Sequence, residues 1–476
     1  MSSIRPKWSN PTSPAKCSGH RDDYAKACGI MSNADAEQRR SPLPEERSLA
    51  TIHSEKRLDP ASALELVSTS ARLLFGNGQT TERIITASEQ LAEELGFRAS
   101  LFPRWGELVV RIEDEAGSRY EIMVAEPVGM DMSKVSGTMA VIDKVCDGRM
   151  DAAVARSDLE RIARLSPVSI ERFALLAAAG AAALGVIFGV THIFSLLLIA
   201  LSAGAGACLR RWLAGISRNL FVQPFCAALL AGVVGAIAFR LQFSSALRLV
   251  AICPSMVLVP GPHFLNGMLD LARARIGLGT ARIIYASLIT VMICTGLLLG
   301  LALLGVSLPA SGPSRSAPLV YDVIAAGIAV AAYGTFFAMP WRMLPIPILV
   351  GMLAHASRWA AISLSGASAE TGALIACLLV GAIVTPIADR MRLPFAGLAF
   401  ASVVSLIPGV FLFRMAGGLV DLVTLGPHAP QELLIEVITD GTTAVLIILA
   451  MSFGLIVPKM CIPYFTQLSI HRPQQR

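Results

Sequence analysis

Apolar side chains follow two different patterns along the chain. Between residues 58 and 171 they recur every three or four positions in four segments, which predicts amphipathic helices at 64–74, 84–95, 135–142 and 155–162. Two short stretches, Leu108–Ile112 and Tyr120–Val124, are separated by the polar run Glu113–Gly117 and predict a strand hairpin. These roughly 110 residues are enough for a core of their own, so we expect a small α/β domain.

After Ser166-Pro167, long apolar runs replace the amphipathic segments. Each run approaches the roughly 20 residues that a helix needs to cross about 30 Å of hydrocarbon. We count ten runs, with an error of one or two: residues 172–190, 193–209, 220–239, 246–265, 281–305, 319–339, 345–362, 371–388, 395–413 and 439–458. The pattern predicts a polytopic α-helical membrane protein with about ten transmembrane helices, preceded by the small N-terminal α/β soluble domain.

Composition agrees with a membrane protein, since 54% of the residues are hydrophobic and only 16% are charged. The net charge of +6 is unevenly distributed, with +3 in residues 1–57, −7 in residues 58–171 and +10 in residues 172–476. The acidic segment argues against nucleic acid as a partner, because phosphate binding needs a basic face. Residues 1–57 have mixed charge, many Ser and Pro residues and no apolar signal-peptide core, so we expect a disordered tail.

Basic residues at the ends of the apolar runs indicate the orientation. With the N-terminus in the cytosol, thirteen Lys and Arg residues fall at inside ends and five at outside ends. Cytoplasmic loops carry such an excess, so both termini are expected in the cytosol.

The nine cysteines are scattered without a CxxC pair, and several lie inside apolar runs. We therefore interpret them as small packed hydrophobic residues and not as disulfides or metal ligands. No metal and no cofactor is expected.

The two halves of the membrane part resemble each other at an offset of about 147–150 residues. Arg211–Ser217 is matched by Arg358–Ser363, and Ser255–Gly261 is matched by Ser402–Gly409. Each half, residues 172–310 and residues 311–476, holds five predicted helices. Because five is odd, the second half must insert upside down relative to the first. Inverted repeats of this kind build many secondary transporters, with the substrate site near the midplane.

Pro-Gly pairs interrupt the fourth and the ninth apolar run at corresponding places, Pro260-Gly261 and Pro408-Gly409. Proline removes a backbone donor and glycine shields its neighbours poorly. In hydrocarbon such a break is tolerated where protein or a water-filled cavity satisfies the freed groups. The pairing favours a substrate path at the two breaks, and kinks needed only for helix packing are the alternative.

Four polar residues near the breaks are candidates for the transport path, because ionisable groups inside a membrane are costly. Asp270 could take up a coupling proton or hold a substrate ammonium, or it could pair with a neighbouring Arg. Asn266 could bond a substrate or another helix, and His263 titrates in the useful range unless it is packed as a neutral ring. Arg414 could bind a carboxylate or reach the headgroups.

At these residues the sequence resembles the threonine/serine exporter family, ThrE. The resemblance rests on Leu74–Gly96, on Val145–Met150, and on Val259-Pro260-Gly261 followed by Asn266 and Asp270-Leu271. The region around Pro408-Gly409 is similar to the second module of the family. The likeness covers about residues 60–460 and leaves out the tail.

The resemblance implies export of small hydroxy amino acids, threonine or serine, across the bacterial cytoplasmic (inner) membrane with a proton gradient as driving force. It implies a small-molecule substrate, a coupling proton and lipid as partners, and leaves a homo-oligomer open. Split relatives are associated with dicarboxylates, so a dicarboxylate exporter is the alternative substrate class. A membrane-anchored enzyme with its site in residues 58–171 is less favoured, because that segment has no His and no evident nucleophile–base pair.

Overall fold

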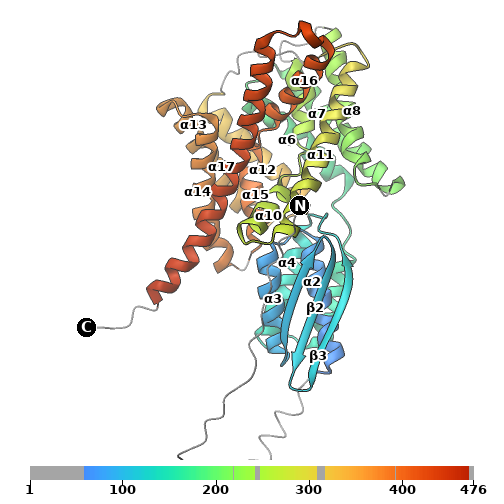
Figure 1. Cartoon of the computed structure of the whole chain (residues 1–476), viewed down its shortest axis with the longest axis vertical. Coiled ribbons are helices and arrows are strands. Elements are labelled where there is room, and N and C mark those ends of the chain that lie inside the picture. Colours follow the sequence, from blue (N-terminus) through green and yellow to red (C-terminus); the bar gives the residue numbers. More distant parts are fainter. Residues whose placement is uncertain (1–57, 218, 242–246, 308–316, 392, 471–476) are drawn as a thin grey trace, which may run out of the picture. The chain divides into compact units, whose positions relative to one another are not determined.

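A computed structural model describes residues 58–470, apart from positions 218, 242–246, 308–316 and 392 (Figure 1). The tail expected at residues 1–57 lies outside the described residues. The described part is mainly helical and contains one three-stranded sheet. The predicted fold class, a polytopic helical protein with a small N-terminal α/β region, is confirmed.

The α/β region has four helices and three strands in the order that the periodicity predicts, with one addition. The elements are α2 (Pro60–Gly76), α3 (Thr81–Glu94), β1 (Arg98–Arg104), β2 (Gly106–Asp114), β3 (Gly117–Ala125), α4 (Met132–Cys146) and α5 (Ala152–Ala163). The predicted hairpin is β2–β3, and β1 extends it to an antiparallel sheet in the order β1-β2-β3.

Local sequence signals explain where these elements begin and how they pack. The Asp59 carboxylate accepts hydrogen bonds from the amides of Ala61 and Ser62, which caps α2 ahead of Pro60. The apolar faces of the helices cover one face of the sheet, where Leu74, Ile84, Leu108, Val135 and Leu159 are buried, as the helical spacing predicts.

Two sets of long apolar helices follow. The first set comprises α6 (Ile170–Ile187), α7 (Ile193–Ile216), α8 (Val222–Arg240), α9 (Leu247–Met256), α10 (Gly261–Ala272) and α11 (Ile276–Ala302). The second comprises α12 (Leu319–Phe336), α13 (Pro345–Ser365), α14 (Ala369–Arg390), α15 (Phe395–Val403), η1 (Val404–Leu406), α16 (Gly409–Leu425), η2 (Gly426–His428) and α17 (Gln431–Ile470). In the described ranges nine helices are long and apolar enough to span a membrane, or ten if the bent pair α9–α10 counts as one span.

Helix packing repeats between the two sets, which we call the first and the second module. The helix α8 packs along α11 in the first module, and α14 packs along α17 in the second. Across the boundary, α6 packs against its counterpart α12, while α10 contacts α15 and α16 contacts α9. Such reciprocal contacts are those of a two-fold relation between similar units.

The modules run antiparallel. Phe173 near the start of α6 packs against Phe336 at the end of α12, with ring centroids 4.5 Å apart. The Arg172 guanidinium lies 3.8 Å from the ring centroid of Trp341, just after α12. The counterpart helices α6 and α12 therefore point in opposite directions, as a sequence repeat of five spans requires.

The α/β region contacts both modules at one end of the helices. The amide of Met132 donates to the carbonyl of Phe337 after α12, at 2.7 Å. The Trp105 ring packs on Tyr285 near the start of α11, with centroids 5.0 Å apart. We call this end of the helices the domain end and the opposite end the far end.

A break interrupts the fourth span of each module. The helices α9 and α10 are bent by 53° at residues 257–260, so the chain continues forward across the break. In the second module, α15 and η1 lead into Ile407-Pro408, and α16 begins at Gly409. Gly261 and Gly409, 148 positions apart, are the first residues of the second half-helices. The corresponding breaks predicted at the two Pro-Gly pairs are therefore present.

Candidate functional site

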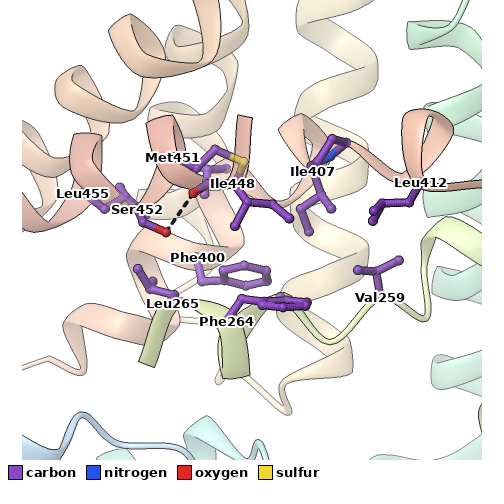
Figure 2. A pocket seen from close by; sticks show the side chains of 13 residues that line it. Val259, Phe264, Leu265, Phe400, Ile407, Leu412, Ile448, Met451, Ser452 and Leu455 are labelled. Atoms are coloured by element: carbon purple, nitrogen blue, oxygen red, sulfur yellow. Dashed lines mark hydrogen bonds between the residues drawn. The ribbon is translucent and has the colours of Figure 1, made fainter. Parts of the chain in front are cut away.

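The two breaks line one cavity, although nearly 150 residues separate them (Figure 2). Its volume is about 40 Å³, against about 10–15 Å³ for one water molecule. The first module supplies Val259, Gly261, Phe264 and Leu265; the second supplies Phe400, Val403, Ile407, Pro408, Leu412, Ile448, Met451, Ser452 and Leu455. The helices α10, α15, α16 and α17 thus meet at this point, and we call it the central cavity.

The glycines of the two pairs allow the modules to approach closely. A Cβ atom on Gly261 would overlap the Phe400 ring and meet Ile407 of the second module. A Cβ atom on Gly409 would lie 2.8 Å from the Cγ of Met256 in the first module. Real Cβ atoms do not approach so closely, so a side chain at either position would push the two breaks apart.

The walls of the central cavity are apolar except at the breaks and at Ser452 of α17. Figure 2 shows Phe264 and Phe400 side by side, with Met451 and Ile448 across from them. The Ser452 hydroxyl donates to the Ile448 carbonyl, 2.8 Å away. The amino ends of α10 and α16 begin at the cavity, and the dipole of each helix directs partial positive charge toward it. The site can therefore stabilise an anionic group of a small ligand.

A second and smaller cavity lies on the other side of the first break. Its lining includes Pro254, Val257 and Leu258 of the first break together with Ser202 and Arg210 of α7. The Arg210 guanidinium lies 6.0 Å from the Phe173 ring centroid and 5.7 Å from that of Phe336. Neither the Nε of Arg210 nor the Ser202 hydroxyl has a hydrogen-bond partner among the described residues. An arginine held in this way can bind a carboxylate.

The residues predicted from sequence to line the transport path do not all lie at the central cavity. Of the predicted path residues, Gly261 and Pro408 line the central cavity, and Pro260 and Gly409 are their neighbours in the breaks. His263 is buried and meets the Tyr285 ring edge-on, with centroids 5.1 Å apart. Arg414 is ion-paired with Asp440 of α17, at 2.9 Å from Nε to the carboxylate. These last two side chains are not part of the described lining.

Asn266 and Asp270 lie where the α/β region docks on α10. The Asn266 side-chain amide donates to the Gly78 carbonyl at 3.2 Å. Asp270 is 1% exposed and pairs with the equally buried Arg282, with 3.3 Å between charged atoms, and with Arg275 at 3.7 Å. Asn266 therefore contacts the α/β region directly, whereas both ion pairs of Asp270 are made within the first module.

Glu82 of α3 lies beside these residues, and we call Glu82, Asn266, Asp270, Arg273, Arg275 and Arg282 the docking cluster. It forms ion pairs with Arg273 and Arg275, the latter at 3.0 Å. Burial opposes ionisation of Glu82, but the hydrogen bond from Arg275 and the charge of Arg273 outweigh it, so the pKa of Glu82 lies below its ordinary value. The Gly76–Thr81 loop between α2 and α3 is thereby positioned against the domain end of the first module.

Sequence reasoning missed a buried polar cluster in the second module. Asp322, His355 and Ser405 come from α12, α13 and η1 and are hydrogen-bonded to one another. The sequence does contain a signal for this cluster, because Asp322 and His355 are ionisable residues inside predicted apolar runs. Neither residue is near a Pro-Gly pair in sequence, so the interrupted runs do not point to them.

Comparison with known families gives an independent assignment. One family model, ThrE, described as a threonine/serine exporter, matches residues 65–304. A second, ThrE_2, described as Threonine/Serine exporter, ThrE, matches residues 322–461. No solved structure matches the chain. The two models match in tandem, the first over the α/β region and the first module and the second over the second module. The protein is therefore a multi-pass membrane protein of the threonine/serine exporter family, in the form that joins both modules in one chain.

Proposed function

We propose that this protein exports small hydroxy amino acids, threonine or serine, across the bacterial cytoplasmic membrane in exchange for protons. The observation that carries the proposal is the meeting of two interrupted helices, one from each antiparallel module, at one cavity. Inverted-repeat transporters bind their substrates at such a junction. Family membership supplies the substrate class.

The polar groups at the breaks suit a zwitterion. The amino ends of α10 and α16 attract the carboxylate, and the carbonyl ends of α9 and η1, on the opposite sides of the breaks, attract the ammonium group. The apolar walls formed by Phe264, Phe400 and Ile407 suit a short side chain once the cavity has opened. Arg210, near the domain end, provides a first contact for the carboxylate on its way to the central cavity.

Alternating access follows from the two-fold arrangement. At about 40 Å³ the central cavity holds a few water molecules and is too small for an amino acid, so this conformation is closed around the site. Rocking of one module against the other would open the cavity first to one end and then to the other. The charge distribution of the loops supports the cytosol as the side of the domain end and of both termini.

A dicarboxylate exporter is the second candidate, because two helix amino ends converge on the same cavity. Two carboxylates could each use one of them, whereas an amino acid uses the amino ends for one carboxylate and the carbonyl ends for its ammonium group.

Transport by purified protein in liposomes tests both candidates. Vesicles with an acidic interior should accumulate labelled serine and threonine against their gradient, and an ionophore that abolishes the pH gradient should stop this accumulation. Accumulation of labelled succinate without serine would select the dicarboxylate exporter. Accumulation of none of the three would contradict the proposed function.

Glycine variants provide a matched control in the same assay. Gly261→Ala places a methyl group against Phe400 in the central cavity, whereas Gly215→Ala, in the last turn of α7, meets no atom within 4 Å. Loss of transport in the first variant only would tie the activity to the cavity.

A further inference from the structure

A chain of three buried polar side chains connects α12, α13 and the second break. The Nδ1 atom of His355 lies 2.9 Å from Oδ2 of Asp322, and its Nε2 atom lies 2.7 Å from Oγ of Ser405. His355 is 0% exposed, Ser405 4% and Asp322 5%. We call these residues the buried triad.

The triad extends from the far end toward the central cavity. Asp322 is in the first turn of α12, which begins at the far end, and His355 is in the middle of α13. Ser405 is in η1, between Val403 and Ile407, and both of these neighbours line the central cavity. A proton that enters beside Asp322 therefore has a hydrogen-bonded route to the break.

Only the second module carries these side chains. At the offset of 147 residues that matches Arg211 with Arg358, His355 corresponds to Cys208, and at the offset of 148 residues between the two Pro-Gly pairs, Asp322 and Ser405 correspond to Ala174 and Val257. The helices of the two modules are related by two-fold symmetry, but the buried triad has no counterpart in the first module. A buried His–carboxylate pair is costly in a membrane, so its presence in one module indicates a role other than helix packing.

Other charged groups near the triad are few. On α13, Arg358 is one turn after His355, and its charge interacts with that of Asp322. The remaining charged residues of the described helices that pack around the triad lie near helix ends: Glu171 and Arg172 on α6, Glu370, Asp389 and Arg390 on α14. Arg358 compensates the charge of Asp322, so uptake of a proton by His355 adds a positive charge beside the break.

We propose that the buried triad is the binding site of the coupling proton, with His355 as the group that takes it up. In neutral His355, the Nδ1–H donates to Asp322 and Nε2 accepts from the Ser405 hydroxyl. When a proton binds to Nε2, this atom becomes a donor, and Ser405 must accept and turn its own hydrogen elsewhere. The reversal occurs two residues before Ile407, so it links protonation to the conformation of the second break.

The same three residue types form the catalytic unit of serine hydrolases, in which a base activates the serine. Here Ser405 is buried, and neither described cavity at the breaks has it in its lining. A carbonyl substrate has no approach to its oxygen, which favours a proton relay over hydrolysis.

The test separates proton coupling from substrate movement and rests on the proposed function. Liposomes loaded with unlabelled serine measure exchange with labelled serine without a gradient, whereas acid-loaded liposomes measure gradient-driven accumulation. His355→Gln should keep exchange within about twofold of the unmodified protein and lower accumulation at least tenfold. The exposed His192 gives the matched control, since His192→Gln should change neither rate.

Two further variants protect the test against a simple folding defect. Asp322→Asn and Ser405→Ala leave His355 in place and should each reduce accumulation more than exchange. Full accumulation by His355→Gln would overturn the proposal, as would equal losses of exchange and accumulation in all three variants. Failure of the unmodified protein to move serine in either assay is a different result, which would contradict the proposed function itself.

Discussion

Removal of Arg282 tests whether the buried ion pair between Asp270 and Arg282 stabilises the fold. Arg282 and Asp270 are each 1% exposed and lie 3.3 Å apart at their charged atoms. Arg282→Met would leave a buried carboxylate without its main partner, which costs about 3–5 kcal/mol. Loss of the contact between the guanidinium and the Phe75 ring, 5.6 Å from its centroid, adds about 1 kcal/mol.

These costs convert to a lower melting temperature by about 5–10 °C in detergent. The double variant Arg282→Met/Asp270→Leu should recover most of the loss, because an apolar pair often replaces a buried ion pair without cost. Thermal unfolding followed by intrinsic fluorescence measures both changes. Arg273→Met is the control, since Arg273 pairs with the half-exposed Glu82 and should cost no more than about 1 kcal/mol. An unchanged melting temperature in Arg282→Met, or a double variant as unstable as the single one, would refute the reasoning.

Three other predictions concern the cavities and the docking cluster. Gly261→Ala should lower serine transport at least tenfold by forcing Phe400 out of place, whereas Gly215→Ala should stay within twofold of the unmodified protein, both measured as initial rates. Arg210→Gln should raise the KM for serine about tenfold with little change in Vmax if Arg210 binds the carboxylate, since a charge-assisted hydrogen bond contributes about 1.5 kcal/mol or more; an unchanged KM would exclude that contact. The lowered pKa of Glu82 means that its ionised form stabilises the folded protein above its unperturbed pKa of 4.5, and that this contribution is lost as the pH falls through the lowered pKa. The melting temperatures of Glu82→Gln and of the unmodified protein should therefore differ at pH 7 and converge as the pH falls below 4.5 and through the lowered pKa; a difference that does not change with pH would contradict this prediction.

Periodicity in the sequence was sufficient to predict most elements, because apolar spacing is set locally. It revealed the amphipathic helices, the β2–β3 hairpin and the apolar spans. It missed β1, Arg98–Arg104, because this strand contains Pro103 and lacks a clear alternation of polar and apolar residues. The paired breaks were found because Pro-Gly is a local signal with a direct effect on the backbone.

The polar chemistry was harder to predict, because it depends on contacts between distant segments. His355 meets residues 33 and 50 positions away, and no local pattern connects them. Asp270 and Asn266 attracted attention as polar residues after a break, but their partners include Arg282 on α11 and Gly78 in the α/β region. Only the packing of α11 against α10, and the approach of the loop between α2 and α3 to Asn266, reveal these contacts.

The docking contacts also connect the α/β region with both modules. It reaches the first module through Glu82 and the second through Met132, whose amide bonds to Phe337. A relative movement of the modules at the domain end would therefore strain or break one of these contacts.

Access to the central cavity from both sides tests the central claim most directly. Ile407 lines the cavity, so Ile407→Cys, introduced after replacement of the nine native cysteines, reports on solvent entry. A membrane-impermeant thiol reagent should label the introduced thiol from the domain end under one pH gradient and from the far end under the opposite gradient, with protection by serine on both sides. Active protein in which this thiol never reacts from either side, or reacts equally with and without serine, would show that transport does not pass between the two breaks.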